Sequence, residues 1–105
     1  MKNLENRVII ITGAAMGLGL ATAKELASKG ANLTLVDYNE KSLGEAKDEI
    51  NQQFPEVVIV TVVADVSNED AVKNYVDETV KAFGRIDGLN NNAGHRRQAG
   101  RHYRV

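Results

Sequence analysis

Two patterns of apolar residues alternate along the chain: short β-branched runs, and longer stretches with helical spacing. The runs end at glycine or acidic residues, which is typical of buried parallel strands. The longer stretches repeat apolar residues every three or four positions, which predicts amphipathic helices. Strands are expected at Arg7–Thr12, Ala31–Val36, Val57–Val63 and Ile86–Asn90, and helices at Leu18–Lys29, at Glu40–Phe54 and from the residues after Ser67 to Phe83.

Residues that cap or stop helices mark the ends of these stretches. Gly30 and Gly84 each follow a periodic stretch, and Pro55 disfavours helix at the residue before it. Ser67, with Asp70 three residues later, is expected to be the N-cap of the last helix. The buried face of that helix is expected to consist of Val72, Tyr75, Val76, Thr79, Val80 and Phe83.

The resulting order is strand and helix in strict alternation, which predicts a parallel sheet with helices on both faces. Right-handed crossovers make the strand order 3-2-1-4 the expected one, with a topological switch point between strands one and four. The fold class is therefore α/β, a doubly wound parallel sheet of the Rossmann type. Only its N-terminal half is expected here, because the alternation stops after the fourth strand.

A glycine-rich segment, Thr12 to Gly19, joins the first strand to the first helix. Its glycines at 13, 17 and 19 allow the backbone to turn sharply and to approach a pyrophosphate closely. The free N–H groups at the helix start would then face the anion. The spacing is GxxxGxG and not the more common GxGxxG, so a turn with only a structural role is the alternative.

Asp37 ends the second strand, eighteen residues after Gly19. An acid at this place can accept hydrogen bonds from both ribose hydroxyls of an adenosine, and it would repel a 2′-phosphate. The alternative is that Asp37 caps the next helix, although Asn39 could do so instead.

Three segments together resemble the signature of the short-chain dehydrogenase/reductase family, and the resemblance covers about residues 5–94. They are Thr12 to Gly19, Asp65-Val66, and Asn91 to Gly94 after the fourth strand. The resemblance implies an NAD(P)-dependent oxidoreductase acting on alcohols or carbonyls. It also implies a cofactor site in which the glycine-rich turn holds the pyrophosphate, Asp65 and Val66 flank the adenine, and the last motif lines the ribose. The site residues so implied are Gly13, Met16, Gly17, Leu18, Gly19, Asp37, Asp65, Val66, Asn92, Ala93 and Gly94.

Within this family, members that prefer NADP often carry a basic residue at the position of Met16 or directly after the acid. This chain has Met16 and Tyr38 there, so the resemblance implies NAD as the cofactor. It also implies that Asn91 braces the central strands. Asn90 departs from the pattern, because that strand position is usually apolar, and its amide must find partners or cost stability.

The catalytic serine and Tyr-x-x-x-Lys pair of the family are missing from the sequence. Ser42 and Thr79 stand four residues after Tyr38 and Tyr75, and Tyr103 is followed by two residues only. A reductase needs an acid to protonate the developing alkoxide. The chain is therefore expected to be inactive alone, with no catalytic residue assigned. A non-catalytic nucleotide-binding module and a Rossmann methyltransferase fragment are the alternative functions.

Charge divides the chain at Gly94. Residues 1–94 hold all 14 acidic and nine of the 13 basic residues, a net charge of −5, whereas residues 95–105 hold four arginines and no acid. The expected organisation is a partial dinucleotide-binding domain at 1–94 and a basic tail at 95–105, disordered or translated out of frame after a frameshift or early stop. A nucleic-acid-binding arm is the weaker alternative, and a metal site at His95 and His102 is weaker still.

The remaining composition limits location and partners. The chain has no cysteine, which fits a reducing cytoplasm, and its longest near-apolar run, Val57 to Ala64, is too short to span a bilayer. The expected partners are the dinucleotide and, in a full-length form only, an alcohol or carbonyl substrate. Family members are often homo-oligomers, but this fragment is expected to lack the interface.

Overall fold

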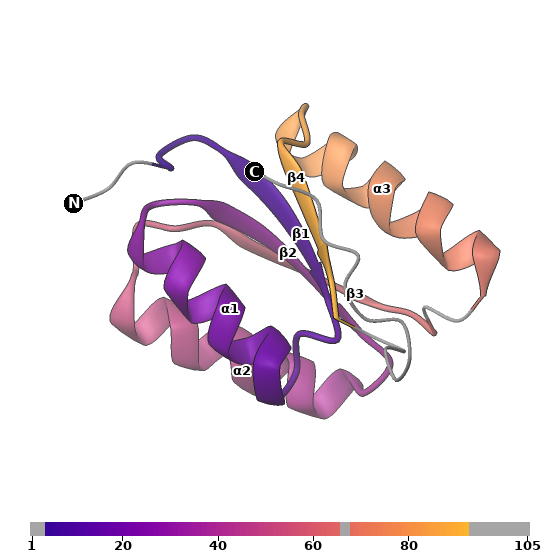
Figure 1. The fold of residues 1–105 in the computed structure, drawn as a ribbon, viewed down its shortest axis with the longest axis horizontal. Coiled ribbons are helices and arrows are strands. Elements are labelled where there is room, and N and C mark those ends of the chain that lie inside the picture. Colours follow the sequence, from indigo (N-terminus) through magenta and orange to yellow (C-terminus); the bar gives the residue numbers. More distant parts are fainter. Residues whose placement is uncertain (1–3, 66–67, 93–105) are drawn as a thin grey trace.

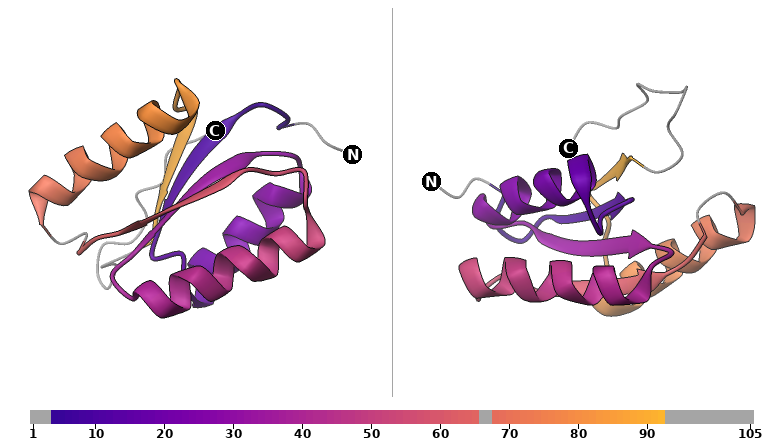
Figure 2. Two further views of the ribbon diagram at one scale, coloured as in Figure 1. Left: turned by 180° about the vertical axis from the view of Figure 1, so that it is seen from behind. Right: turned by 90° about the horizontal axis from the view of Figure 1, so that it is seen from below.

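Four parallel strands in the order β3-β2-β1-β4 form the sheet, as the alternation of patterns predicts. The computed structural model describes residues 4–65 and 68–92, and the expected tail at 95–105 lies outside these ranges. The elements are β1 (Val8–Thr12), α1 (Gly17–Ser28), β2 (Asn32–Asp37), α2 (Glu40–Gln53), β3 (Ile59–Val63), α3 (Glu69–Phe83) and β4 (Gly88–Asn91). Helices α1 and α2 cover one face of the sheet and α3 covers the other, which is the Rossmann-type arrangement (Figures 1 and 2).

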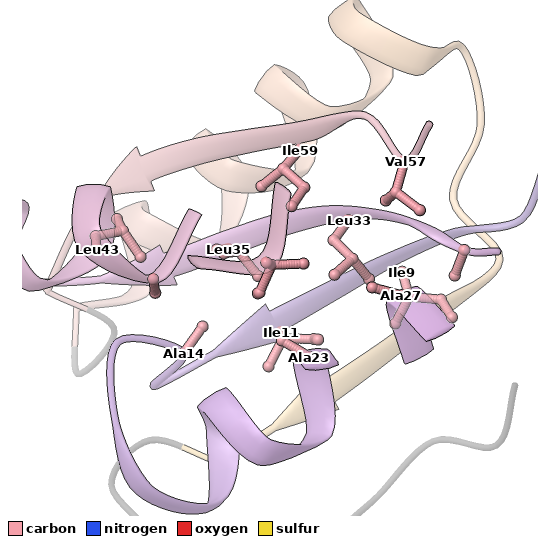
Figure 3. Packing of buried hydrophobic residues seen from close by; sticks show 13 residues of the cluster. Ile9, Ile11, Ala14, Ala23, Ala27, Leu33, Leu35, Leu43, Val57 and Ile59 are labelled. Atoms are coloured by element: carbon pink, nitrogen blue, oxygen red, sulfur yellow. The ribbon is translucent and has the colours of Figure 1, made fainter. Parts of the chain in front are cut away.

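The larger core lies between the sheet and the pair α1 and α2. All five residues of β1 are buried, because this central strand is covered on both faces. Side chains from β1, β2 and β3 meet small residues of α1 and larger ones of α2 (Figure 3). The small residues, Ala23 and Ala27, let α1 lie close to the sheet.

Two strands begin later than their apolar runs predict, and each has a hydrogen-bonding reason. The Val58 N–H donates to the Asn32 side chain at 2.9 Å, so the β3 ladder starts at Ile59. Likewise, the Val8 N–H donates to the Asp87 side chain at 2.8 Å, and the pairing of β4 with β1 starts at Gly88. Side chains have taken the place of ladder partners at both positions.

Helix ends agree with the sequence at Gly30 but not at Ser67. Gly30 has φ +94°, and its N–H donates to the Ala27 carbonyl at 2.9 Å, which is the Schellman pattern expected of a glycine stop. The prediction that Ser67 caps α3 is wrong. The N-cap is Asn68, which has an extended backbone and whose Oδ1 accepts from the Asp70 N–H at 2.8 Å.

The α3 face of the sheet has a smaller core than the other face. Ala71, Tyr75 and Thr79 are the buried residues of the helix. Val72 and Val80 were expected to be buried, but they are 43% and 48% exposed. The residues that α3 places against β2 and β3 lie one position before these valines, so the valines are left on the flank of the helix. Within the described ranges no helix is long and apolar enough to cross a membrane.

A pair of buried hydroxyls joins α3 to the middle of β2. The Oγ1 atoms of Thr34 and Thr79 lie 2.9 Å apart, and Thr79 Oγ1 is 2.7 Å from the Tyr75 carbonyl oxygen. Both threonines are fully buried. Each hydroxyl carries one hydrogen, so Thr34 can donate to Thr79 and Thr79 to the Tyr75 carbonyl, and neither buried hydroxyl is left without a partner.

We expect Thr79→Val to lower the free energy of unfolding by about 1–3 kcal/mol, because it leaves the Thr34 hydroxyl buried next to a methyl group. The double variant Thr34→Val with Thr79→Val should recover much of this loss, since both polar groups are then gone. Urea unfolding of the two single variants and the double variant measures the effect. A double variant less stable than either single one would contradict the interpretation.

Arg85 and Asp87 form an ion pair directly before β4. Arg85 donates two hydrogen bonds to the Asp87 carboxylate, at 2.9 and 2.7 Å. The hydrogen bond from Arg85 lowers the pKa of Asp87 most; burial opposes it, and the Val8 N–H adds to it. A carboxylate whose pKa is lower in the folded than in the unfolded chain stabilises the fold above its unfolded value, about 3.9.

Stability should therefore fall as the pH drops from about 3.9 through the lower folded pKa of Asp87. We expect Asp87→Asn to be less stable than the natural sequence near neutral pH. The difference should shrink as the pH falls below about 3.9, and it should be smallest below the lower folded pKa of Asp87, where the natural carboxyl is protonated in the folded chain too. Denaturant unfolding at a series of pH values tests this, and a difference that stays constant with pH would contradict it.

Candidate functional site: the glycine-rich turn and the carboxyl edge of the sheet

The turn between β1 and α1 depends on two left-handed glycines. Gly13 has φ +65° and Gly17 has φ +61°, a region that side chains with a Cβ rarely adopt. Between them Ala14 and Ala15 are buried, and Met16 is extended as the N-cap of α1. The turn therefore directs the chain from the buried strand straight into the first turn of the helix.

Gly19 is required for a different reason, the close approach of α1 to the turn. A Cβ at this position would lie 2.0 Å from the Gly13 carbonyl oxygen and 3.1 Å from the Cα of Ala14. Both atoms belong to the backbone and cannot rotate away. The third glycine thus sets how closely the helix packs on the end of β1.

The N-terminus of α1 has no side chain that neutralises its partial charge. Its N-cap makes no side-chain hydrogen bond, and no acidic residue stands in its first turn. The partial positive charge of the helix end is therefore not neutralised by its own side chains. Met16 and Leu18, which are 61% and 71% exposed, form an apolar border beside it.

Asp37, at the end of β2, lies directly beside this turn. Its Oδ2 accepts from the Ala15 N–H at 2.9 Å, and its Oδ1 accepts from the Tyr38 N–H at 2.7 Å and from the Asn39 N–H at 3.4 Å. The N-cap of α2 is Asn39, whose Oδ1 accepts from the Ser42 N–H at 3.0 Å. Asp37 is therefore not the cap of the following helix. The sequence did not reveal its bond to Ala15, since nothing in the spacing marks that backbone group.

The asparagine motif after β4 is tied to the end of β1. Thr12 Oγ1 donates to Asn91 Oδ1 at 2.8 Å, and it accepts from the Asn92 N–H at 3.1 Å. Asn91 thus ties β4 to the central strand β1, which agrees with the bracing role that the resemblance implies. Asn90, the unusual amide in the strand, is satisfied by Asn92, whose Nδ2 donates to Asn90 Oδ1 at 2.8 Å.

The end of β3 completes the same edge of the sheet. The Ala64 N–H donates to the Asp37 carbonyl at 2.9 Å, which places exposed Asp65 next to the end of β2. Asp37 ends β2, and the glycine-rich turn, Asp65 and Asn92 follow the ends of β1, β3 and β4. Figure 1 shows these four strands side by side, and their carboxyl ends form the edge at which ligands bind in open α/β sheets. Val66, Ala93 and Gly94, also predicted as site residues, lie outside the described residues, as do His95 and His102. Among residues 4–65 and 68–92, no three acidic or histidine side chains gather closely enough to hold a metal ion.

Comparison with known proteins shows to which family this chain belongs. A family model described as short chain dehydrogenase matches residues 7–103. The chain belongs to the short-chain dehydrogenase family. The match runs nine residues beyond Gly94, where the resemblance in the sequence ended.

Relatives and solved structures agree with this membership. Levodione reductase of Leifsonia aquatica is 48% identical over 89 residues, covering 85% of this chain and 33% of the relative. A crystal structure of levodione reductase superposes with a TM-score of 0.84 at 47% identity, over 88% of this chain and 36% of that one. NAD⁺-bound xylitol dehydrogenase gives a TM-score of 0.83 at 39% identity, over 90% and 35% of the two chains. The chain spans about a third of the length of the curated relatives that it matches.

We expect Gly19→Ala to destabilise this short-chain dehydrogenase chain, because the added methyl group would overlap the Gly13 carbonyl. Overpacking of this kind costs about 1–3 kcal/mol. Gly44→Ala is the matched control, since Gly44 lies inside α2 and an added methyl group there would meet nothing within 4 Å. The control should gain roughly 0.5–1 kcal/mol. Thermal melts of both variants test the pair, and equal stabilities would contradict the role given to Gly19.

Proposed function

We propose that the chain binds a nicotinamide dinucleotide at the carboxyl edge of its sheet, and that it prefers NAD to NADP. The observation that carries this proposal is the uncapped N-terminus of α1 beside the carboxylate of Asp37, with the glycine-rich turn between them. The helix end suits the pyrophosphate, and the acid suits the adjacent ribose. A carboxylate at that place would also repel a 2′-phosphate.

Names of related structures support the cofactor class but not the choice between the two cofactors. One is xylitol dehydrogenase bound to NAD⁺, and another is L-sorbose reductase of Gluconobacter frateurii complexed with NADPH and L-sorbose, with 35% identity and a TM-score of 0.84. The preference for NAD therefore rests on this chain's own residues. These are Asp37, with exposed Tyr38 directly after it and Met16 in the turn, so that neither neighbouring position carries a basic group.

Each group of site residues is proposed to contact a different part of the cofactor, from the adenine to the ribose side. Asp65 and Val66 flank the adenine, and Asp37 accepts from the adenosine ribose. The backbone of the turn holds the pyrophosphate, through Gly13, Met16, Gly17, Leu18 and Gly19. Asn92, Ala93 and Gly94 line the ribose side of the cofactor.

A bound nicotinamide supplies hydride transfer, which must be matched by a proton donor and acceptor at the substrate oxygen. No tyrosine of this sequence has a lysine four residues after it, so we propose that these 105 residues bind and orient the cofactor without completing the reaction. Oxidation of alcohols or reduction of carbonyls is the activity proposed for the whole protein. The second candidate, a non-catalytic nucleotide-binding module, is favoured by the same missing pair.

We expect calorimetry to show tighter binding of NAD than of NADP. Asp37→Ala should weaken NAD binding by about tenfold or more and should narrow the difference between the cofactors. A hydrogen bond to a charged group is worth roughly 1.5–3 kcal/mol, which sets this scale. Asp48→Ala is the control, because Asp48 lies exposed on α2 and its substitution removes the same charge elsewhere.

Equal affinities for the two cofactors would contradict the role of Asp37. Binding of S-adenosylmethionine in place of NAD would contradict the cofactor class and would favour the methyltransferase alternative.

A further inference from the structure

We infer that Asp37 is also a positioning residue, whose carboxylate holds the glycine-rich turn in the shape that receives a pyrophosphate before any nucleotide is bound. The inference rests on the proposed function for its consequence, because the turn is the proposed pyrophosphate site. The geometry on which it depends belongs to the chain alone.

The turn is docked onto the end of β2 by two consecutive residues. The Ala14 N–H donates to the Val36 carbonyl at 3.2 Å, and the Ala15 N–H donates to Asp37 Oδ2 at 2.9 Å. Ala15 is 6% exposed and Asp37 is 8% exposed, so water competes little for this charged hydrogen bond. Of the two contacts, only the second depends on a side chain, and it is the one that a substitution can remove.

The segment that Asp37 holds lies between two glycines, whose backbone freedom is high. Ala15 stands between Gly13 and Gly17, two glycines in the left-handed region. Glycines lose more conformational freedom on folding than other residues, so an anchor between them limits the shapes open to the turn. Because Ala15 directly precedes the N-cap Met16, its position also fixes where the first N–H groups of α1 lie.

The carboxylate is itself oriented by the backbone that follows it. Oδ1 accepts from the Tyr38 and Asn39 N–H groups, as in an Asx-turn, which directs Oδ2 toward Ala15. A carboxylate has about four acceptor directions, and the three N–H groups of Ala15, Tyr38 and Asn39 occupy three of them. One direction, on Oδ2, remains, so the same group can hold the turn and accept from one ribose hydroxyl, and not from both as its position in the sequence suggests.

This double role changes what a substitution at Asp37 does. If Asp37 acted only on the ribose, Asp37→Ala would leave the turn intact and would remove a repulsive charge near the pyrophosphate. If Asp37 also holds the turn, the same change loosens the pyrophosphate site. The two possibilities predict opposite changes in the binding of an anion that has no ribose.

The test uses the nucleotide-free chain and amide hydrogen exchange followed by NMR. We expect Asp37→Ala to speed exchange of the Ala15 N–H by about tenfold or more, the scale of a lost hydrogen bond to a charged group. Asp37→Asn keeps one acceptor oxygen, so its Ala15 exchange rate should lie between the rates of the natural sequence and of Asp37→Ala. This variant also provides the test if the alanine variant does not fold. Asp48→Ala should leave Ala15 unchanged. The Leu33 N–H, which donates to the Val58 carbonyl, should stay protected in every variant and thus reports that the sheet is intact.

The second measurement is the affinity for inorganic pyrophosphate, followed by the shifts of the Gly17 and Leu18 amide signals. We expect Asp37→Ala to bind it several-fold more weakly than the natural sequence does. Affinity that stays equal or rises, or Ala15 exchange that matches Asp48→Ala, overturns the inference. Failure of the natural chain to bind NAD would instead refute the proposed function and would leave the exchange result to decide the role of Asp37.

Discussion

Contact between α1 and the end of β1 is the constraint on which the site depends. At Gly19 the helix lies so close to the Gly13 carbonyl that no Cβ fits between them. This closeness fixes the helix over the central strand, and the small residues Ala23 and Ala27 continue the same close packing along α1. A helix held further from the strand would move its N-terminus away from the end of β2, and the turn would no longer lie within reach of Asp37.

Much of the fold could be predicted from the sequence because it follows from periodicity and from glycine. Buried parallel strands are apolar on both faces, so their runs are visible in the sequence, and the crossover rule then leaves one natural strand order. Helix stops at Gly30 and Gly84 were predictable, since both have positive φ. Strand starts were not, because they depend on hydrogen bonds between residues far apart in the sequence, from Val58 to the Asn32 side chain and from Val8 to the Asp87 side chain.

Errors on α3 have a related cause. Ser67 and Asn68 are both good caps, and sequence alone does not tell which of two neighbours has the extended backbone. The apolar pattern of α3 is wider than the face that the sheet can cover, so Val72 and Val80 looked like core residues although they lie on its flank. A periodic pattern thus identifies the helix but does not fix which of its residues face the sheet.

For the site, the motif spacing located the turn, Asp37 and the asparagines, but not the hydrogen bonds between them. The Thr12–Asn91 and Asp37–Ala15 bonds join residues 79 and 22 positions apart. Such contacts depend on strand register, which the sequence does not display. Family membership does not determine the choice between NAD and NADP either, because one related structure is named with NAD⁺ and another with NADPH.

The two described tyrosines have contrasting surroundings, and this gives the chain a built-in optical probe. Tyr75 is 2% exposed under the α3 face, whereas Tyr38 is 76% exposed beside Asp37, and the sequence has no tryptophan. Ultraviolet absorbance of a phenol shifts when it leaves an apolar environment, so Tyr75 should dominate the change from these two residues when α3 detaches from the sheet. Tyr38 is already in water and should respond instead to a molecule that settles at the end of β2. Tyrosine absorbance would thus report both the detachment of the α3 layer and the occupancy of the carboxyl edge of the sheet, without any added label.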